Sequence, residues 1–219
     1  MELRNCPECG GLTKTEARLL CSECGYPYWS ATCSHGGADG APGPLRYVAY
    51  LSMGRYKGQP VLWRPLIEEG GRMLIISVSI VDCRPYSEET FAEDGFEESG
   101  LRTWLNEVLL FDMFDTKERA AVEGGAFCLD AAQAESLFED DADRIAFPTA
   151  YAALRAYGDE CGNAACWWLA DPGGPDCAQF VRHDGQVYPF GMNAEYNYGV
   201  RPALWVKNAD ACWREHPDA

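Results

Sequence analysis

The stretch that decides the fold class is ACWWLADPGGPDCAQFVRHDGQVYPFGMNAEYNYGVRPALWV, residues 165–206. Runs of apolar and aromatic residues alternate there with clusters of Gly, Pro, Asn and Asp, a pattern typical of successive β-strands. His183-Asp184-Gly185 separates the second run from the third, and Asp-Gly favours a tight hairpin turn. The predicted strands span residues 165–170, 178–182, 186–188 and 200–206.

Upstream of this stretch, strand and helix patterns alternate without a regular βαβ repeat. Two apolar runs, residues 61–67 and 72–78, flank Glu68-Glu69-Gly70-Gly71, which predicts a hairpin. Apolar spacing predicts a helix from Leu101, with Ser99 as its N-cap. The predicted fold class is therefore α+β with antiparallel strands. The apolar face of this helix comprises Leu101, Trp104, Leu105, Val108 and Leu109.

Two shorter helices and a set of core residues complete this pattern. Asp130 with Gln133 is typical of a capping box at the start of a helix. Residues 149–157 form a second predicted helix, which Gly158 ends. The core is expected to contain Trp63, Trp104, Trp167 and Trp205.

Arg201 lies inside the last predicted strand, among apolar residues. A buried guanidinium needs a carboxylate or several carbonyl oxygens as partners. We expect a structural ion pair, with Asp171 or another acid as the partner.

Composition restricts the classes of function. The 219 residues include 18 Lys and Arg against 34 Asp and Glu, a formal net charge of −16. Such a surface repels polyphosphate, so nucleic acid is not an expected partner. No run approaches the roughly 18 apolar residues of a membrane helix. The first ten residues, MELRNCPECG, lack the apolar run of a signal peptide. We expect a soluble cytoplasmic protein without a membrane partner.

The N-terminal cysteines predict a structural zinc site. Cys6 and Cys9 form one C-x2-C pair, and Cys21 and Cys24 form a second. Each pair, on a tight turn followed by Gly, offers two corners of a tetrahedron, so the four thiolates would hold one closed, structural Zn²⁺. Eleven cysteines without an export signal also favour metal ligands and reduced thiols over disulfides.

Cysteines and glycines divide the chain into an N-terminal and a larger C-terminal part. Five cysteines precede the run of Gly and Pro that ends near residue 44, which is typical of a linker. The predicted organisation is a zinc ribbon over residues 1–33, a linker over 34–46, an α+β domain over 47–208 and a tail over 209–219.

The two cysteine pairs resemble the zinc ribbons that begin many bacterial proteins. Such ribbons bind nucleic acid, bind protein partners or cap a neighbouring domain. Few basic residues stand near the cysteine pairs, so we expect a protein-facing or structural role.

Six segments of the large domain, in this order, resemble an uncharacterised domain family of bacteria and their phages. The family motifs are GxYxQ, WRVL, LRxWLN, PTxYA, WWLRSPG and GVRPALWL, and the resemblance covers about residues 51–208. This chain has WRPL and WWLADPG, so the Arg and Ser of the fifth motif are missing. The matching segments here are residues 54–56, 62–66, 101–106, 148–152, 167–173 and 199–205.

The closing pattern, a Trp-rich strand, a variable hairpin and a final Gly-Val-Arg strand, is similar to the C-type-lectin-like fold. Formylglycine-generating enzymes and the variable proteins of diversity-generating retroelements use that fold. The resemblance implies a ligand face between Asp171 and Gly199, rich in aromatic and amide side chains. The alternative is that its tyrosines cover the core and its asparagines shape turns. The candidate ligand-binding residues are Asp171, His183, Tyr188, Asn193, Glu195, Tyr196, Asn197 and Tyr198.

The sequence leaves three hypotheses of function. The first is a non-enzymatic, zinc-binding module whose lectin-like domain binds a protein or peptide, with no catalytic residue. The second is an oxidase similar to the formylglycine-generating enzymes, with Cu(I) held by Cys161 and Cys166. In those enzymes, however, the cysteine pair lies close before the final strand. The third is a structural module of a larger assembly, without a small ligand.

Overall fold

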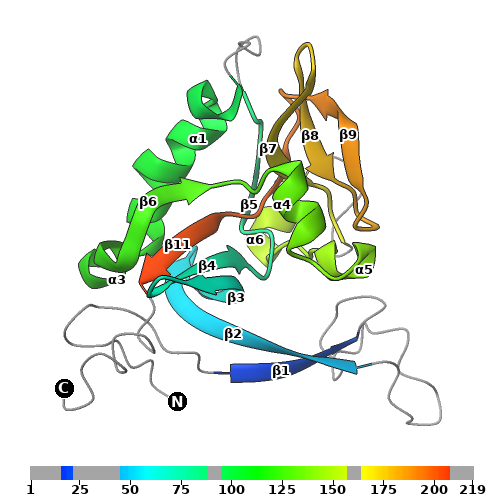
Figure 1. Cartoon of the computed structure of the whole chain (residues 1–219). Coiled ribbons are helices and arrows are strands. Elements are labelled where there is room, and N and C mark those ends of the chain that lie inside the picture. Colours follow the sequence, from blue (N-terminus) through cyan, green and yellow to red (C-terminus); the bar gives the residue numbers. More distant parts are fainter. Residues whose placement is uncertain (1–15, 22–44, 88–94, 157–163, 208–219) are drawn as a thin grey trace, which may run out of the picture.

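The computed structural model describes residues 16–21, 45–87, 95–156 and 164–207, which form two β-sheets with short helices around them (Figure 1). Among these residues, the larger sheet has six strands in the order β1-β2-β3-β4-β11-β6, and all its neighbours are antiparallel. Its strands are β1 (Glu16–Cys21), β2 (Leu45–Tyr56), β3 (Gln59–Glu69), β4 (Arg72–Ser77), β6 (Val122–Phe127) and β11 (Ala203–Lys207).

The second sheet, in the same described part of the chain, has five strands in the order β5-β10-β7-β8-β9. Its pairs are antiparallel except for the parallel pair of β10 with β7. The structure thus confirms the predicted α+β class, with mostly antiparallel strands in two sheets and a few short helices. The strands are β5 (Asp82–Arg84), β7 (Trp167–Gly174), β8 (Cys177–Val181), β9 (Val187–Asn193) and β10 (Tyr198–Val200).

Both predicted hairpins are present. β3 pairs with β4 in a register that places Glu69 opposite Arg72, and the two glycines between them have positive φ angles. β8 pairs with β9, and Gly185 in the turn between them has a φ of 88°. Gly tolerates this left-handed conformation without the steric cost that other residues have, which explains why these turns were visible in the sequence.

The predicted helix from Leu101 is present, but one of its turns is wider than an α-helix. It comprises α1 (Gly100–Trp104), the π-helical turn η2 (Leu105–Leu109) and α2 (Leu110–Met113). Ser99 caps it as predicted, since its hydroxyl accepts a hydrogen bond from the Arg102 backbone N–H. Val108, expected on the buried face, is 43% exposed. The π turn adds a residue per turn and rotates this position toward solvent.

In the described part of the chain, four shorter helices follow η1 (Gly95–Glu98) and the helix from α1 to α2. The capping box at Asp130 is confirmed, because the side chains and backbone N–H groups of Asp130 and Gln133 exchange hydrogen bonds. The helix predicted over 149–157 is shorter: its α-helical part ends at Ala153, where Arg155 closes a tighter turn on the Ala152 carbonyl. Gly158 lies outside the described residues. The four helices are α3 (Thr116–Ala121), α4 (Ala131–Ser136), α5 (Asp141–Arg144) and α6 (Ala150–Ala153).

The single strand predicted over residues 200–206 is instead two strands in different sheets. β10 ends at Val200 and pairs with β5 and β7, whereas β11 begins at Ala203 and pairs with β4 and β6. Pro202 stands at the break, where its missing N–H cannot contribute to a sheet. Its carbonyl accepts a hydrogen bond from the Ser77 N–H. The chain therefore passes from one sheet to the other at Arg201-Pro202.

Arg201 is buried at this crossing, with 3% of its surface exposed. Its Nε donates to the Ser77 carbonyl at 2.7 Å and its Nη1 donates to the Arg144 carbonyl at 3.3 Å. Asp171, the carboxylate named from the sequence, accepts a hydrogen bond from the Ala131 backbone N–H at 2.6 Å. Two carbonyl oxygens are therefore hydrogen-bond partners of this guanidinium, whereas the predicted partner was the carboxylate of Asp171 or another acid.

The predicted core tryptophans are buried with one exception. Trp63 and Trp167 are fully buried and Trp104 nearly so. Trp205 is only partly buried, because it lies in β11 on a face that Arg72 covers, with the guanidinium 4.2 Å from the ring centroid. The sequence pattern of alternating apolar residues did not indicate which face of β11 was inner.

The N-terminal strand β1 contacts the larger sheet along the whole of its length. Its register with β2 places Glu16 opposite Tyr50 and Cys21 opposite Leu45. β1 thus falls in the predicted zinc ribbon and the first residues of β2 in the predicted linker. Most of residues 1–46 lie outside the described residues, so the predicted domain boundaries stay predictions.

Candidate functional site

A row of aromatic side chains crosses the second sheet from its centre to its edge. Trp168 in β7, Phe180 in β8 and Tyr188 in β9 are neighbours in the strand register. The ring centroids of Trp168 and Phe180 are 6.4 Å apart, and those of Phe180 and Tyr188 are 5.3 Å apart. Phe190 continues the row, 5.8 Å from Tyr188. The row therefore connects the buried core with the surface.

The outer end of this row is exposed. Tyr188 is 37% exposed and Phe190 is 74% exposed, and both lie on β9, the edge strand of the second sheet. Tyr196 is also exposed, in the turn after β9. We call these three residues the aromatic edge. Figure 1 shows β9 as the outermost strand beside β8.

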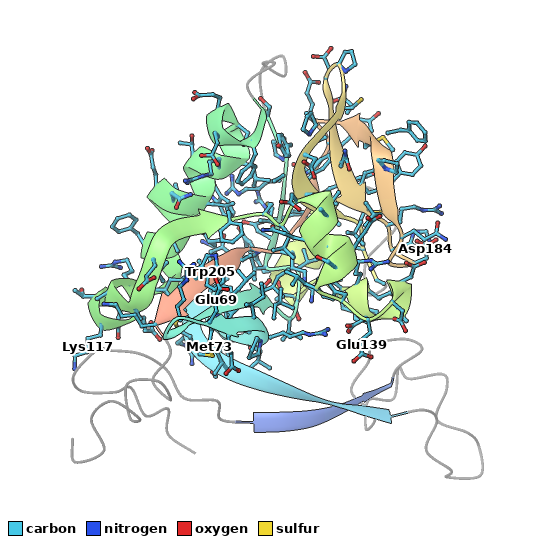
Figure 2. The ribbon with its side chains drawn as sticks, in the orientation of Figure 1. Glu69, Met73, Lys117, Glu139, Asp184 and Trp205 are labelled. Atoms are coloured by element: carbon cyan, nitrogen blue, oxygen red, sulfur yellow. The ribbon has the colours of Figure 1, made fainter. Side chains whose placement is uncertain are left out.

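The structure separates the candidate ligand-binding residues into two groups. His183 lies in the turn between β8 and β9, the turn in which Asp184 is labelled in Figure 2. Asn193 and the residues after it lie at the opposite end of β9. Because a strand rises about 3.3 Å per residue, the seven residues of β9 keep the two groups well apart. The second group comprises Asn193, Glu195, Tyr196, Asn197 and Tyr198.

Several of these candidates have contacts that shape the fold. Asp171 bonds the backbone at the start of α4, as described above. Asn193 accepts a hydrogen bond from the Glu195 backbone N–H at 2.8 Å, which is typical of a turn. Tyr198 is partly buried, with its ring 4.9 Å from that of Trp168. Phe190 was absent from the candidates, although its position two residues after Tyr188 places both on one face of a strand.

A buried carboxylate forms a second cluster, in β5. Asp82 is fully buried and accepts a hydrogen bond from the Tyr56 hydroxyl at 2.8 Å. Its ion pairs are with Arg155 Nε at 2.8 Å and Arg84 Nε at 3.4 Å. Burial raises the pKa of Tyr56 above its ordinary value, and the hydrogen bond to Asp82 acts in the same direction. The phenol is therefore a neutral donor at physiological pH.

A groove of about 500 Å³ lies between the end of β5 and the helix that begins with α1. None of the ligand-binding residues predicted from the sequence lines this groove, because its two walls come from segments that carry no common motif. Tyr198, one of the candidate ligand-binding residues, is the strand partner of Arg84, which lines the groove. The groove is lined by Arg84, Pro85, Ser87, Glu98, Gly100, Leu101, Thr103, Trp104 and Val108.

The predicted zinc ligands Cys6, Cys9 and Cys24 lie outside the described residues, and Cys21 is the last residue of β1. Within the described ranges, no group of three or more His, Cys, Asp or Glu residues could hold a metal ion. Cys166 is buried, with 6% of its surface exposed, and Cys161 lies outside the described residues. No helix in the described part of the chain is long and apolar enough to cross a membrane.

Comparison with known proteins gives one family match. No curated protein and no solved structure matches this chain. The model of a domain of unknown function, DUF6273, matches residues 123–208, from β6 to the residue after β11. The match contains the aromatic edge, whereas Asp82 and the groove lie before it. Residues 123–208 of this protein are therefore similar to DUF6273, a domain of unknown function.

Proposed function

We propose that this protein is a non-enzymatic, cytoplasmic binding module, in which a zinc ribbon adjoins a lectin-like domain that binds a protein or peptide. The exposed aromatic edge carries this proposal. Large aromatic side chains are enriched at protein interfaces because they bury much apolar area at a low cost in conformational entropy. The ring of Tyr188 packs against Phe180 and the ring of Phe190 packs against Tyr188, so a partner would meet an ordered surface.

The charges near the aromatic edge indicate what kind of partner it suits. Glu195 is exposed and precedes Tyr196. Asp176, also exposed, accepts a hydrogen bond through its carbonyl from the Ala194 N–H, so it lies beside the same turn. With a net charge of −16, the protein favours a partner segment that combines apolar and basic side chains.

A triple variant tests the binding surface. In Tyr188→Ser, Phe190→Ser, Tyr196→Ser, we expect proteins that wild type captures from a cell lysate to be lost, with little change in the melting temperature. Quantitative mass spectrometry of the captured proteins measures this. The control is Phe111→Ser, Leu154→Ser, which removes two exposed apolar side chains elsewhere. Equal capture by wild type and the triple variant would contradict the proposal.

Metal analysis tests the ribbon. We expect one zinc ion per chain in protein purified under reducing conditions, and its loss in Cys6→Ser, Cys9→Ser. Two thiolates do not complete a tetrahedral site, which explains the expected loss. The variant Cys128→Ser is the control, because Cys128 is a buried free thiol of the large domain whose pKa burial raises to about 12. Protein without zinc, or zinc retained by the double variant, would contradict the predicted ligands.

A further inference from the structure

The groove between β5 and α1 is built around a stacked arginine and tryptophan. The guanidinium carbon of Arg84 lies 4.2 Å from the ring centroid of Trp104. Trp104 is 8% exposed, whereas the Arg84 side chain is 28% exposed and lines the groove. Stacking on an aromatic ring orients the planar guanidinium, so its N–H groups are positioned before a ligand arrives.

Arg84 shares its buried carboxylate partner with Arg155. Asp82 carries one negative charge, and Arg84 and Arg155 each carry a positive charge against it. Arg155 lies at 2.8 Å from this carboxylate and Arg84 at 3.4 Å, so Arg155 is the closer partner. Tyr56 adds a hydrogen bond to the same carboxylate. Arg84, the more distant of the two guanidinium groups, lines the groove and can also bind a ligand anion.

The indole nitrogen of Trp104 is buried at this place without a hydrogen-bond acceptor. Trp104 Nε1 has no hydrogen-bond partner among the described residues, and Arg84 Nε has only its ion-pair contact with Asp82 at 3.4 Å. A buried donor without an acceptor destabilises the structure, so the indole N–H would gain a hydrogen bond to a ligand oxygen. A ligand oxygen in the groove is such an acceptor.

The other residues that line the groove favour a ligand with a single negative charge and an apolar body. Pro85, Leu101 and Val108 give the groove apolar surface. Glu98 also lines it, and the whole chain has a net charge of −16. Both disfavour a phosphate or a dicarboxylate. The volume of about 500 Å³ suits a small organic molecule or the last residues of a peptide.

We infer that this groove binds a monocarboxylate with an apolar body, that Arg84 is its anchor, and that Trp104 Nε1–H is a second donor to it. The site is separate from the aromatic edge and does not depend on the protein partner proposed there. Two sources offer this chemistry: a free carboxylic acid, and the C-terminal carboxylate of a peptide with an apolar last residue.

The test is an NMR titration of the ¹⁵N-labelled full chain, observed at the indole N–H signal of Trp104. That signal is assigned by its absence from the spectrum of the Trp104→Phe variant. The probes are 4-phenylbutyrate with its amide, and acetyl-Ala-Ala-Leu with its C-terminal amide. We expect saturable shifts with at least one carboxylate. We expect the matched amide to bind at least about tenfold more weakly, because it loses the charged contact. Binding of the acid alone would identify a free carboxylate, and binding of the peptide a C-terminus.

Arginine variants complete the test. We expect Arg84→Gln to weaken carboxylate binding about tenfold or more, and Arg84→Lys to retain part of it as a point charge without the planar fork. Arg72→Gln is the matched control, because Arg72 does not line the groove but also stacks on a tryptophan, Trp205, at 4.2 Å and pairs with Glu69. Figure 2 labels Trp205 and Glu69.

Three results would overturn the inference: no shift with either carboxylate, equal binding of carboxylates and amides, or unchanged binding in Arg84→Gln. If the melting temperature shows that Arg84→Gln is unfolded, the comparison of Arg84→Lys with wild type decides. Binding by Arg84→Lys equal to that of wild type would then exclude a role for the guanidinium.

Discussion

Replacing Asp82 with alanine is expected to lower the free energy of unfolding by about 3 kcal/mol, at the lower end for the loss of one member of a buried ion pair. The carboxylate is fully buried and has two guanidinium groups and a phenol as partners. Without it, the buried Tyr56 hydroxyl loses its acceptor and two positive charges face each other. The expected loss is not larger because Arg84 and Arg155 are partly exposed to water. Urea unfolding measures it.

Two controls separate the charge from its individual contacts. Tyr56→Phe removes only the hydrogen bond, with an expected cost of about 1 kcal/mol. Asp112→Ala removes a surface ion pair with Lys57, in which both side chains are well exposed, and we expect a change below about 1 kcal/mol. A loss in Asp82→Ala no greater than that in Asp112→Ala would show that this cluster does not stabilise the fold.

The second large effect is expected at Gly185, in the turn between β8 and β9. A Cβ atom there would lie 1.7 Å from the Asp141 carbonyl oxygen of α5, and the φ angle is +88°. The Gly185 carbonyl also accepts a hydrogen bond from Arg144 Nε at 2.8 Å. Gly185→Ala must therefore displace the turn from α5, at an expected cost of about 2–4 kcal/mol. Thermal and urea unfolding measure this loss.

Gly58→Ala is the matched control for this substitution. Gly58 has a φ of +83°, but a Cβ atom there would meet nothing within 4 Å. Its expected cost is only the conformational one, about 1 kcal/mol. Equal losses in the two variants would mean that the contact with α5 contributes nothing and that the backbone angle accounts for the whole effect.

Local sequence patterns predicted the features that depend on neighbours along the chain. The Ser99 cap, the capping box at Asp130 and both hairpins arise from residues within a few positions of one another. In each case, a side chain or a glycine satisfies a requirement of the backbone at that place. These local requirements of the backbone do not depend on the tertiary structure around them.

The candidate sites depend on contacts between distant segments, so the sequence predicted them only in part. Tyr188 and Tyr196 were named from the sequence and are exposed. Asp82 is contacted by Tyr56 and Arg155, which lie 26 and 73 positions away, and no motif connects them. The break at Arg201-Pro202 and the π turn were also missed, because apolar spacing alone does not show where a strand changes sheets or a helix widens.

The position of β11 in the larger sheet has a consequence for biosynthesis. This strand is near the C-terminal end of the described residues, yet it lies between β4 and β6. Until β11 has been synthesised, no strand connects β4 with β6. The edge of each strand that pairs with β11 in the finished sheet is then unpaired. Unpaired edges are open to non-native pairing in a nascent chain. The larger sheet is therefore complete only when residues 203–207 have left the ribosome. Until then, the order in the emerging chain comes from its local hairpins.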